Sequence, residues 1–496
     1  MRRYYVLLAL FLIVLTIRLI ASHQSPGFSY DTYDLFRQSE HVLDTGKPLF
    51  DDPSSLGGRE RVFNPLYGYI LAFFGLFMSL ELVFWIIPNI FASLTVIVVF
   101  HIVFLITKSE KISLLFSGLS GFIPIFFIGT VNNASVLTLA VPLFLLSTYY
   151  FLLTSRESKN VYKLIFSLVF LSLLDTISIA LVFGLLVYLI FLKLKNFRES
   201  IRESEVILFF TMLVLWLNIL VFKRAIETHQ NPFIWRNLPG ELTSSIYSQI
   251  SFGEAIYAIG SVLIIFGLLS AYYNLFESKR KSVTLYLSLA LVFTFALIFR
   301  IIEFYSGLIF LGVSLLILSS YSFQKLSELL SNFKLKYSPY VFSGLIVLVQ
   351  IALFLPAFFA SMSGVDSPTQ RDISAMTFMQ DFESAKILGQ YFEGDFISYY
   401  SNQQNAIDND FLLISNVDKF YGDAVGVFTD RFLTGALSKL TRLEVTHIFL
   451  SERYQLQTDR TSLLYEDDQC IVKIYPQQTD YEYHPKIYEV RCVLVE

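Results

Sequence analysis

The sequence predicts a polytopic α-helical membrane protein that also carries a C-terminal domain of mixed helices and strands. Of its 496 residues, 54% are apolar and only 16% are charged, whereas soluble proteins contain about 25% charged residues. Residues 1–361 carry a net charge of +6 and residues 362–496 a net charge of −10. Apolar runs long enough to cross a bilayer recur up to residue 361 and then stop. An ordinary soluble enzyme, a disordered chain and a nucleic-acid binder are therefore excluded.

The apolar body contains eleven segments that we predict to span the membrane. They are residues 4–22, 82–107, 112–129, 132–153, 162–175, 176–192, 205–222, 254–276, 283–300, 303–323 and 339–361. The first segment is longer than the apolar stretch of a cleaved signal peptide, so we expect it to be a retained anchor. Arg18 lies near its outer end, where we expect it to anchor the helix at the interface.

Lys and Arg in the short loops predict the orientation, because they concentrate on the cytoplasmic side. The bias is consistent only if the apolar stretch 64–80 does not cross, so we predict an interfacial helix there, on the outer surface. The N-terminus is then cytoplasmic, and residues 1–361 form a transmembrane domain with outside loops at 23–81 and 223–253. The acidic domain, residues 362–496, is extracytoplasmic.

The C-terminal domain shows helical patterns at 371–391 and 430–443. Strand-like runs lie at 411–417, 446–451, 470–475 and 486–495, which together predict a small α/β or α+β domain. Cys470 and Cys492 each fall in one of these runs. A disulfide between them and two unpaired cysteines both remain open.

The first outside loop is rich in acids, and its polar residues have helical spacing. A helix starting at Asp31 would place Asp34, Arg37 and His41 on one face. Acids at the start of a helix also suit its dipole. For Asp34 and His41, a salt-bridged surface helix therefore remains the alternative to a functional site.

The order of residues in 28–66 resembles the start of GT-C superfamily glycosyltransferases. The family is closest in its membrane sugar transferases, which are related to oligosaccharyltransferase catalytic subunits and protein O-mannosyltransferases. Layout is similar over the whole chain, whereas motif-level likeness is largely confined to 28–66. The matching residues are Asp31, Tyr33, Arg37, Gly46-Lys47-Pro48, Asp52-Pro53, Gly57-Gly58-Arg59 and Pro65-Leu66.

The resemblance implies transfer of a sugar, a hexose or a pentose, from a polyprenyl (dolichyl or undecaprenyl) phosphate carrier, with inversion at the anomeric carbon. It implies that Asp31 is the general base and that Asp34 is a second catalytic candidate. Tyr33, Asn133 and Glu303 are then expected near the acceptor or the cavity. Membrane lipid and a glycan, lipid or protein acceptor are the implied partners; nucleic acid is not.

A leaving phosphate needs a cation on the outer side. Arg300 lies at the outer end of a predicted span, and an ionisable residue at that depth suggests function. The resemblance adds weight, because related enzymes carry an arginine near the start of a late helix. Snorkelling, or a pair with Glu303, is the alternative for Arg300. Further candidates for the donor phosphate are Arg37, Arg59, Arg61 and Arg236.

The predicted second outside turn carries Asn132 and Asn133 where the family usually has an acidic motif. Amide oxygens are neutral and suit Mg²⁺ or Mn²⁺ less well than carboxylates. No cofactor is therefore certain, and a divalent cation is the less favoured interpretation. Such a cation would be held by Asp31 together with either Asp34 or Asp52. A plain polar turn is the alternative for the two asparagines.

The acceptor is expected to be a hydroxyl. The acidic domain contains no tryptophan, so the W-W-D-Y-G type of acceptor motif found in oligosaccharyltransferases is absent. Addition of a single sugar to a glycan, lipid or protein hydroxyl is favoured over recognition of asparagine sequons. The alternatives are a polytopic transporter and a non-catalytic protein of envelope glycan assembly.

Overall fold

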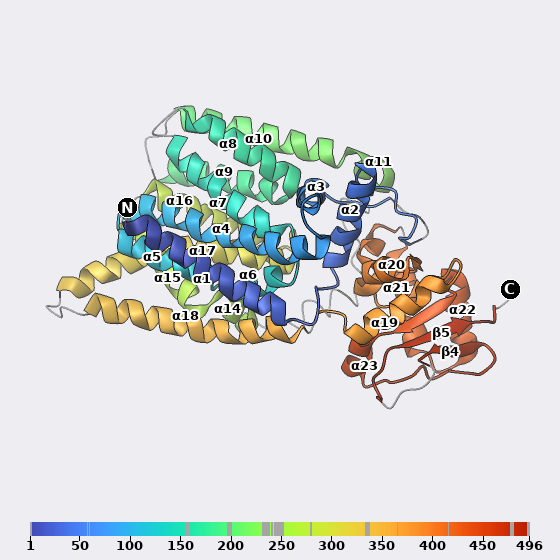
Figure 1. Ribbon diagram of the computed structural model, residues 1–496. Helices are drawn as coiled ribbons and strands as arrows, with labels where there is room; N and C mark the ends of the chain where they lie inside the picture. Colours follow the sequence, from blue (N-terminus) through green and yellow to red (C-terminus); the bar gives the residue numbers. More distant parts are fainter. Residues whose placement is uncertain are drawn as a thin grey trace. The chain divides into compact units, whose positions relative to one another are not determined.

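The computed structural model describes most of the chain and is mainly helical (Figure 1). The described residues are 2–56, 58, 60–154, 159–195, 201–230, 239, 242, 252–277, 280–332, 338–364, 366–414, 416–476 and 481–493.

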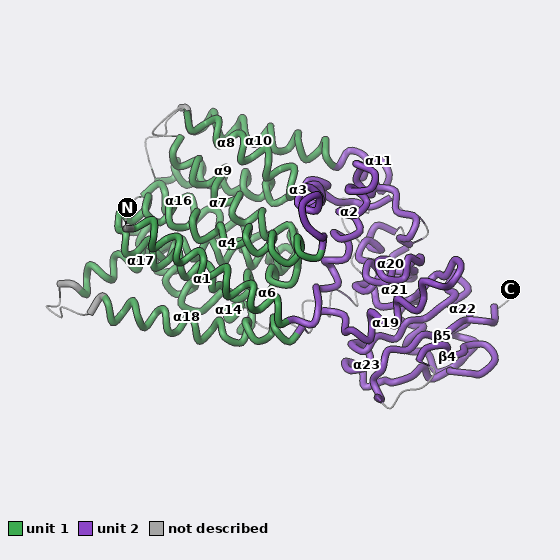
Figure 2. The backbone as a smooth tube through the Cα atoms, viewed as in Figure 1, with its two compact units in different colours: residues 1–24, 81–221, 250–363 green, residues 25–80, 222–249, 364–496 purple. Residues whose placement is uncertain are grey.

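The chain divides into two compact units, coloured separately in Figure 2. Unit 1 comprises residues 1–24, 81–221 and 250–363, and unit 2 comprises residues 25–80, 222–249 and 364–496. The two stretches that we expected to be outside loops of the transmembrane domain thus belong to the same unit as the acidic C-terminal residues.

Unit 1 consists of helices. They are α1 (Arg2–Gln24), α4 (Leu80–Thr107), α5 (Glu110–Ser120), α6 (Pro124–Val131), α7 (Leu137–Thr154), α8 (Asn160–Leu174), α9 (Ile177–Leu194), α10 (Ile201–Val221), α14 (Phe252–Ile259), α15 (Ser261–Tyr272), α16 (Lys281–Ile298), α17 (Phe304–Asn332) and α18 (Ser338–Ser363). A short π-helical turn, Tyr273–Glu277, continues α15.

Eight helices of the described chain are long and apolar enough to cross a membrane: α1, α4, α7, α9, α10, α16, α17 and α18. Two bent pairs raise the number to 10 if each pair is one span, namely α5 with α6, bent by 48°, and α14 with α15, bent by 86°. The remaining predicted segment, 162–175, corresponds to α8, whose 15 residues are shorter than a full crossing. The apolar stretch 64–80 forms α3 (Leu66–Gly75), a helix of only 10 residues.

Small residues allow the helices of unit 1 to approach closely. A Cβ atom on Gly184 of α9 would lie 2.3 Å from the side chain of Leu289 on α16, so these two helices meet at a position that requires glycine. Ser319 of α17 donates a hydrogen bond to the backbone carbonyl of Leu263 on α15 at 2.8 Å. Helix α17 is the most buried span, as expected for the centre of a bundle.

Unit 2 combines helices with a five-stranded sheet. Its helices are α2 (Thr32–Thr45), α3, α11 (Lys223–His229), α19 (Gln370–Phe378), α20 (Gly394–Ser401), α21 (Val417–Thr429), α22 (Leu433–Leu443) and α23 (Glu452–Thr458). Its strands are β1 (Lys386–Leu388), β2 (Gln404–Asn405), β3 (His447–Leu450), β4 (Ile471–Tyr475) and β5 (Lys486–Val490).

The sheet is mixed, with the strand order β2-β1-β3-β5-β4. β1 pairs in parallel with β2 and β3, and β5 is antiparallel to β3 and β4. The predicted strands at 446–451 and 470–475 are confirmed as β3 and β4, and the run predicted at 486–495 forms β5 as far as Val490. The prediction for 411–417 is wrong: Asn409–Leu413 is a 3₁₀ turn, because the Asp408 carboxylate accepts a hydrogen bond from the backbone N–H of Asp410 and starts a turn instead.

A disulfide joins Cys470 and Cys492 beside β4 and β5, across a separation of 22 residues. Closing a loop of this length in the unfolded chain is worth about 3 kcal/mol. Replacing both cysteines with serine is expected to lower the free energy of unfolding of unit 2 by about that amount. Proteolysis of the whole protein in increasing urea measures it. Reduction of the wild type should reproduce the shift, and an unchanged midpoint would contradict it.

Candidate active site

Asp31 occupies the position immediately before α2, so the predicted helix start is confirmed. Its side chain makes no capping hydrogen bond to the helix and is exposed. The Asn409 amide donates a hydrogen bond to Asp31 Oδ1 at 3.1 Å. The carboxylate is therefore oriented by the C-terminal part of unit 2 and still open to solvent.

Aromatic rings attach α2 to α20. Tyr33 is only 2% exposed, and its ring centroid lies 5.4 Å from Phe396 and 5.5 Å from Tyr399. Phe36, one turn further along α2, lies 5.4 Å from Tyr399. The structure therefore places Tyr33 in the core of unit 2, because positions 33 and 36 share the helix face that packs on α20.

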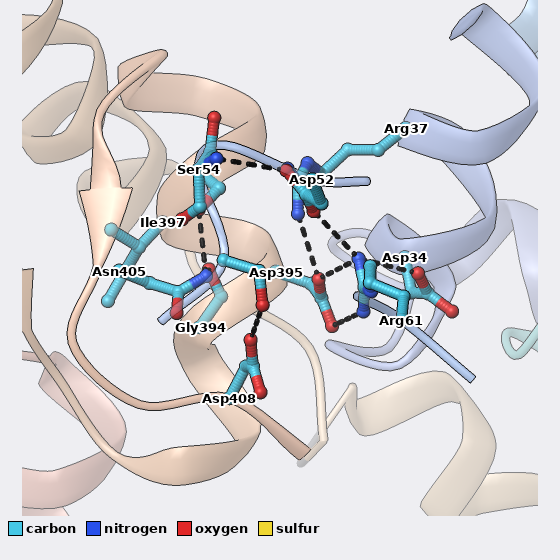
Figure 3. A network of polar contacts seen from close by, with 12 residues as sticks. Asp34, Arg37, Asp52, Ser54, Arg61, Gly394, Asp395, Ile397, Asn405 and Asp408 are labelled. Carbon is cyan, nitrogen blue, oxygen red and sulfur yellow. Dashed lines mark hydrogen bonds and ion pairs between the residues drawn. The ribbon is translucent and has the colours of Figure 1, made fainter. Parts of the chain in front are cut away.

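Ion pairs join Asp34, Arg37, Asp52, Arg61 and Asp395 of unit 2 into one network (Figure 3). Arg37 binds Asp52 Oδ1 at 2.6 Å through Nη2 and Asp395 Oδ1 at 3.1 Å through Nη1. Arg61 Nη1 lies 2.8 Å from Asp395 Oδ1 and 3.3 Å from Asp52 Oδ2. The same nitrogen is 2.9 Å from Asp34 Oδ1. Asp395 at the start of α20 thus links both arginines of the first loop to the C-terminal part of the chain.

Backbone contacts strengthen the same junction. The carbonyl of Ser54 accepts hydrogen bonds from the backbone N–H of Asn405 at 2.9 Å and from the Ser398 hydroxyl at 3.2 Å. Ser55 donates a short hydrogen bond to the carboxylate of Asp408. The Asp-Pro stretch that resembles the family motif is therefore built into the structure of unit 2.

Arg37 and Arg61 were expected to bind the donor phosphate, and their surroundings argue against it. The side chain of Arg37 is 9% exposed and that of Arg61 is 3% exposed. Carboxylates already occupy the charged nitrogens of both guanidinium groups, because partners distant in sequence fold onto them. A phosphate would have to displace an internal ion pair to reach either arginine.

Burial and neighbouring charges shift the pKa values of two aspartates in this network. Burial opposes ionisation of Asp395, but Arg61 and Arg37 together hold the pKa of Asp395 below its ordinary value. Burial raises the pKa of Asp34 to about 7; Arg61 opposes this shift, while Asp395 and Asp410 add to it. Four carboxylates surround two guanidinium groups, so Asp34 is the position at which a proton relieves the excess negative charge.

The raised pKa of Asp34 predicts a pH dependence of stability. Well below pH 4, Asp34 is protonated in the folded and unfolded chain alike. Between about pH 4 and pH 7 only the unfolded chain ionises fully, so the free energy of unfolding falls as pH rises, by at most about 1.4 kcal/mol per pH unit. Urea unfolding between pH 5 and pH 8 measures it. Asp34→Asn should flatten this fall, and an identical slope in the variant would contradict the assignment.

The second outside stretch supplies a further arginine bound by acids. Arg224 of α11 contacts Asp51 Oδ1 at 2.8 Å and Glu60 Oε1 at 2.5 Å. His229 Nε2 lies 3.1 Å from the backbone carbonyl of Glu60. The cations at the start of this stretch thus hold it to the first loop within unit 2. The phosphate candidates Arg59 and Arg236 lie outside the described residues.

Arg300 and Glu303 lie in unit 1, in the short connection between α16 and α17. Both side chains are exposed, and Glu303 accepts a hydrogen bond from the Ser306 hydroxyl at 2.9 Å. Arg300 has a positive φ of 56°, a conformation uncommon outside glycine, asparagine and aspartate. The arginine is thus presented at the end of a predicted span, as the sequence suggested.

Asn132 and Asn133 follow α6 directly in unit 1. The Asn132 amide donates to the backbone carbonyl of Ser361 on α18 at 2.6 Å, which ties the turn to a neighbouring helix. Both asparagines are partly buried.

The sequence did not predict the environment of Arg18 in unit 1. We expected an interfacial anchor, but Arg18 is 1% exposed. Its Nη2 donates to the Thr130 carbonyl at 2.8 Å and to the Thr130 hydroxyl at 2.7 Å, and its Nε donates to Asn89 at 3.1 Å. The last carbonyls of a helix lack partners, so Arg18 caps α6 just before the asparagine turn. Only contacts across three helices could show this.

No family model matches the sequence, and a search of curated proteins also found no match. Solved structures do match. The Archaeoglobus fulgidus oligosaccharyltransferase in its apo form has a TM-score of 0.67 and 14% identity over 90% of this chain and 70% of that one. ArnT from Cupriavidus metallidurans, bound to undecaprenyl phosphate, has a TM-score of 0.52 and 11% identity over 97% of both chains.

Arabinofuranosyltransferase AftD from Mycobacteria matches with a TM-score of 0.55 and 11% identity, over 97% of this chain and 40% of that one. All three are GT-C glycosyltransferases. The chain therefore has the fold of the GT-C glycosyltransferases, a multi-pass membrane protein with a C-terminal domain. Residues 28–66, in which the resemblance to this family was identified, lie within unit 2.

A structure of the Archaeoglobus enzyme contains Zn and sulfate. In the described part of this chain, no three His, Cys, Asp or Glu side chains gather as ligands for a metal ion. Of the acids expected to hold a cation, Asp34 and Asp52 instead face Arg61 and Arg37, whose positive charges disfavour a cation there, and Asp31 accepts a hydrogen bond from Asn409. These residues do not fit a metal site, and we derive no step through one.

Proposed function

We propose that this protein is a membrane glycosyltransferase that moves a sugar from a polyprenyl-phosphate carrier to an acceptor hydroxyl. The observation that carries the proposal is the shared fold, which extends over at least 90% of the chain. Two of the similar structures hold carriers of this class, dolichol-phosphate in the archaeal oligosaccharyltransferase and undecaprenyl phosphate in ArnT.

The proposed chemistry needs a base and a cation. Asp31, exposed and oriented by Asn409, removes the proton of the acceptor hydroxyl. The acceptor oxygen then attacks the anomeric carbon, and the bond from that carbon to the phosphate oxygen breaks with inversion. The polyprenyl phosphate leaves with the electron pair, and Arg300 stabilises its charge. Arg59 and Arg236 remain further candidates for this contact, whereas Arg37 is not proposed.

We also propose that unit 2 lies on the outer face. The positive-inside bias predicts that loops 23–81 and 223–253 and the domain 362–496 are outside. These segments nearly coincide with residues 25–80, 222–249 and 364–496 of unit 2. Agreement between loop charges and an independent division of the fold supports a cytoplasmic N-terminus and an extracytoplasmic C-terminus.

The experiment that tests the activity is donor consumption by the purified wild type in lipid vesicles. We expect loss of a polyprenyl-monophosphate sugar, without comparable loss of a polyprenyl-diphosphate sugar or a nucleotide sugar. A panel of hexose and pentose donors with glycan, lipid and peptide hydroxyl acceptors would identify the product. If no donor of the panel is consumed under any condition, the alternative of a non-catalytic assembly protein replaces this proposal.

A further inference from the structure

A cavity of about 290 Å³ lies in unit 1, and its lining residues are different from the predicted site residues. It forms where the ends of α4 and α7 meet α9 and the starts of α10 and α16. Its walls are apolar where Leu105 and Phe151 line it, and polar where Tyr188, Glu203, Arg280 and Lys281 line it.

Chain connectivity fixes the end of unit 1 at which the cavity lies. Helix α4 begins at Leu80, the last residue of the first segment of unit 2, and the cavity lies at the other end of this helix. Helix α10 likewise passes into unit 2 after Val221, whereas the cavity lies at its start. The loops at this end carry most of the Lys and Arg residues of the body, which the positive-inside bias assigns to the cytoplasm.

The polar wall has an excess of positive charge. Lys281 Nζ lies 2.8 Å from Glu203 Oε2, and Glu203 is only 6% exposed, so the pair is fixed at the cavity wall. Arg280 donates from Nη1 to the carbonyl of Ile106 at 3.1 Å and lies 4.9 Å from the ring centroid of Tyr321. Among the described residues no carboxylate pairs with this guanidinium, so the described lining presents two cations and one anion.

Two further features fit an anion. Helix α16 begins at Lys281, so its first backbone N–H groups have no partner within the helix and its dipole is positive there. Tyr188 is 1% exposed and lines the cavity, yet its hydroxyl makes no hydrogen bond to any residue in the described part of the chain. The hydroxyl oxygen is accessible from the cavity, so it can donate a hydrogen bond to a ligand oxygen there.

We propose that this cavity binds the phosphate of an anionic phospholipid headgroup from the cytoplasmic leaflet. Arg280, Lys281 and the start of α16 would hold the phosphate oxygens, and Tyr188 would donate a hydrogen bond. Free phosphate shares this chemistry, but Leu105 and Phe151 offer apolar surface that suits the first carbons of lipid chains. The inference does not depend on the proposed glycosyl transfer.

The test is native mass spectrometry of delipidated full-length protein titrated with phosphatidylglycerol. Arg280→Gln is expected to weaken binding about tenfold, the loss of one charge-assisted contact, and Tyr188→Phe about threefold. Arg3→Gln is the matched control, because Arg3 lies at the same end of the unit, outside the cavity, and pairs with Glu110. Phosphatidylcholine and inorganic phosphate form the other two arms.

Wild-type affinity in both Arg280→Gln and Tyr188→Phe would overturn the proposal. An equal loss in Arg3→Gln would also overturn it, because binding would then follow general surface charge. Binding of inorganic phosphate that depends on Arg280, without binding of phosphatidylglycerol, would refute the lipid source. If Arg280→Gln does not fold by size-exclusion chromatography, Tyr188→Phe, which removes only one oxygen atom, decides alone.

Discussion

Replacement of Asp31 by asparagine is expected to reduce sugar transfer by about a hundredfold to ten-thousandfold, the usual contribution of a general base. Asparagine has the size of aspartate but cannot accept the acceptor proton. Asp31 is exposed and its carboxylate carries no helix-capping bond, so the substitution should leave the fold intact. Initial rates of donor consumption in vesicles measure the effect, with kcat separated from the apparent KM of the acceptor.

Asp44→Asn is the matched control, because Asp44 is an exposed aspartate near the other end of the same helix. It should retain wild-type transfer. Asp31→Glu keeps the carboxylate but moves it by about one carbon–carbon bond, and an intermediate rate is expected. Full activity of Asp31→Asn in correctly inserted protein would show that Asp31 is not the base. The proposed reaction class would still be tested separately, by the donor-consumption assay.

Replacement of Arg61 by methionine is expected to destabilise unit 2 by about 3–5 kcal/mol, the range for breaking a buried ion pair. Arg61 is 3% exposed and faces Asp34, Asp52 and Asp395, with Asp410 Oδ2 at 3.6 Å from Nε. Without it, Asp52 and Asp395 keep Arg37 as a partner, whereas Asp34 loses its ion pair with Arg61. The pKa values of the remaining acids should rise, so the loss should be larger at pH 8 than at pH 5.

Proteolysis in increasing urea at both pH values measures this loss. Arg431→Gln, which removes an exposed arginine of the same unit, should change stability by less than about 0.5 kcal/mol. Adding Asp395→Asn to the Arg61 variant removes one uncompensated charge, and a double-mutant cycle should report strong coupling. Additive effects of the two changes would show that the pair does not act as a unit.

Elements that depend on local sequence were predictable. The start of α2 at Asp31 was predictable, because acidic residues at helical spacing act within one turn of their own chain. Strands β3, β4 and β5 were predictable for the same local reason. Strands β1 and β2, with three and two residues, are too short to leave a periodic pattern; β1 pairs with an edge of β3, and β2 pairs with β1.

The partners of the charged residues were not predictable. Arg37 and Asp395 are 358 residues apart in the sequence, and no local pattern connects them. Its position in the first loop suggested contact with a phosphate, whereas the folded chain gives Arg37 two aspartates. Arg18 was expected to be an interfacial anchor but instead caps α6. This role depends on Asn89 and Thr130, which lie on helices other than that of Arg18.

The sequence by itself determined that the chain is a membrane protein, where its helices lie and which loops are basic, because hydrophobic length and loop charge are local properties. The tertiary structure alone decided which acids and bases neutralise one another and which remain open, because that depends on contacts between distant segments. It left Asp31 exposed, buried Arg37 and Arg61 among aspartates, and assembled the basic cavity around Arg280.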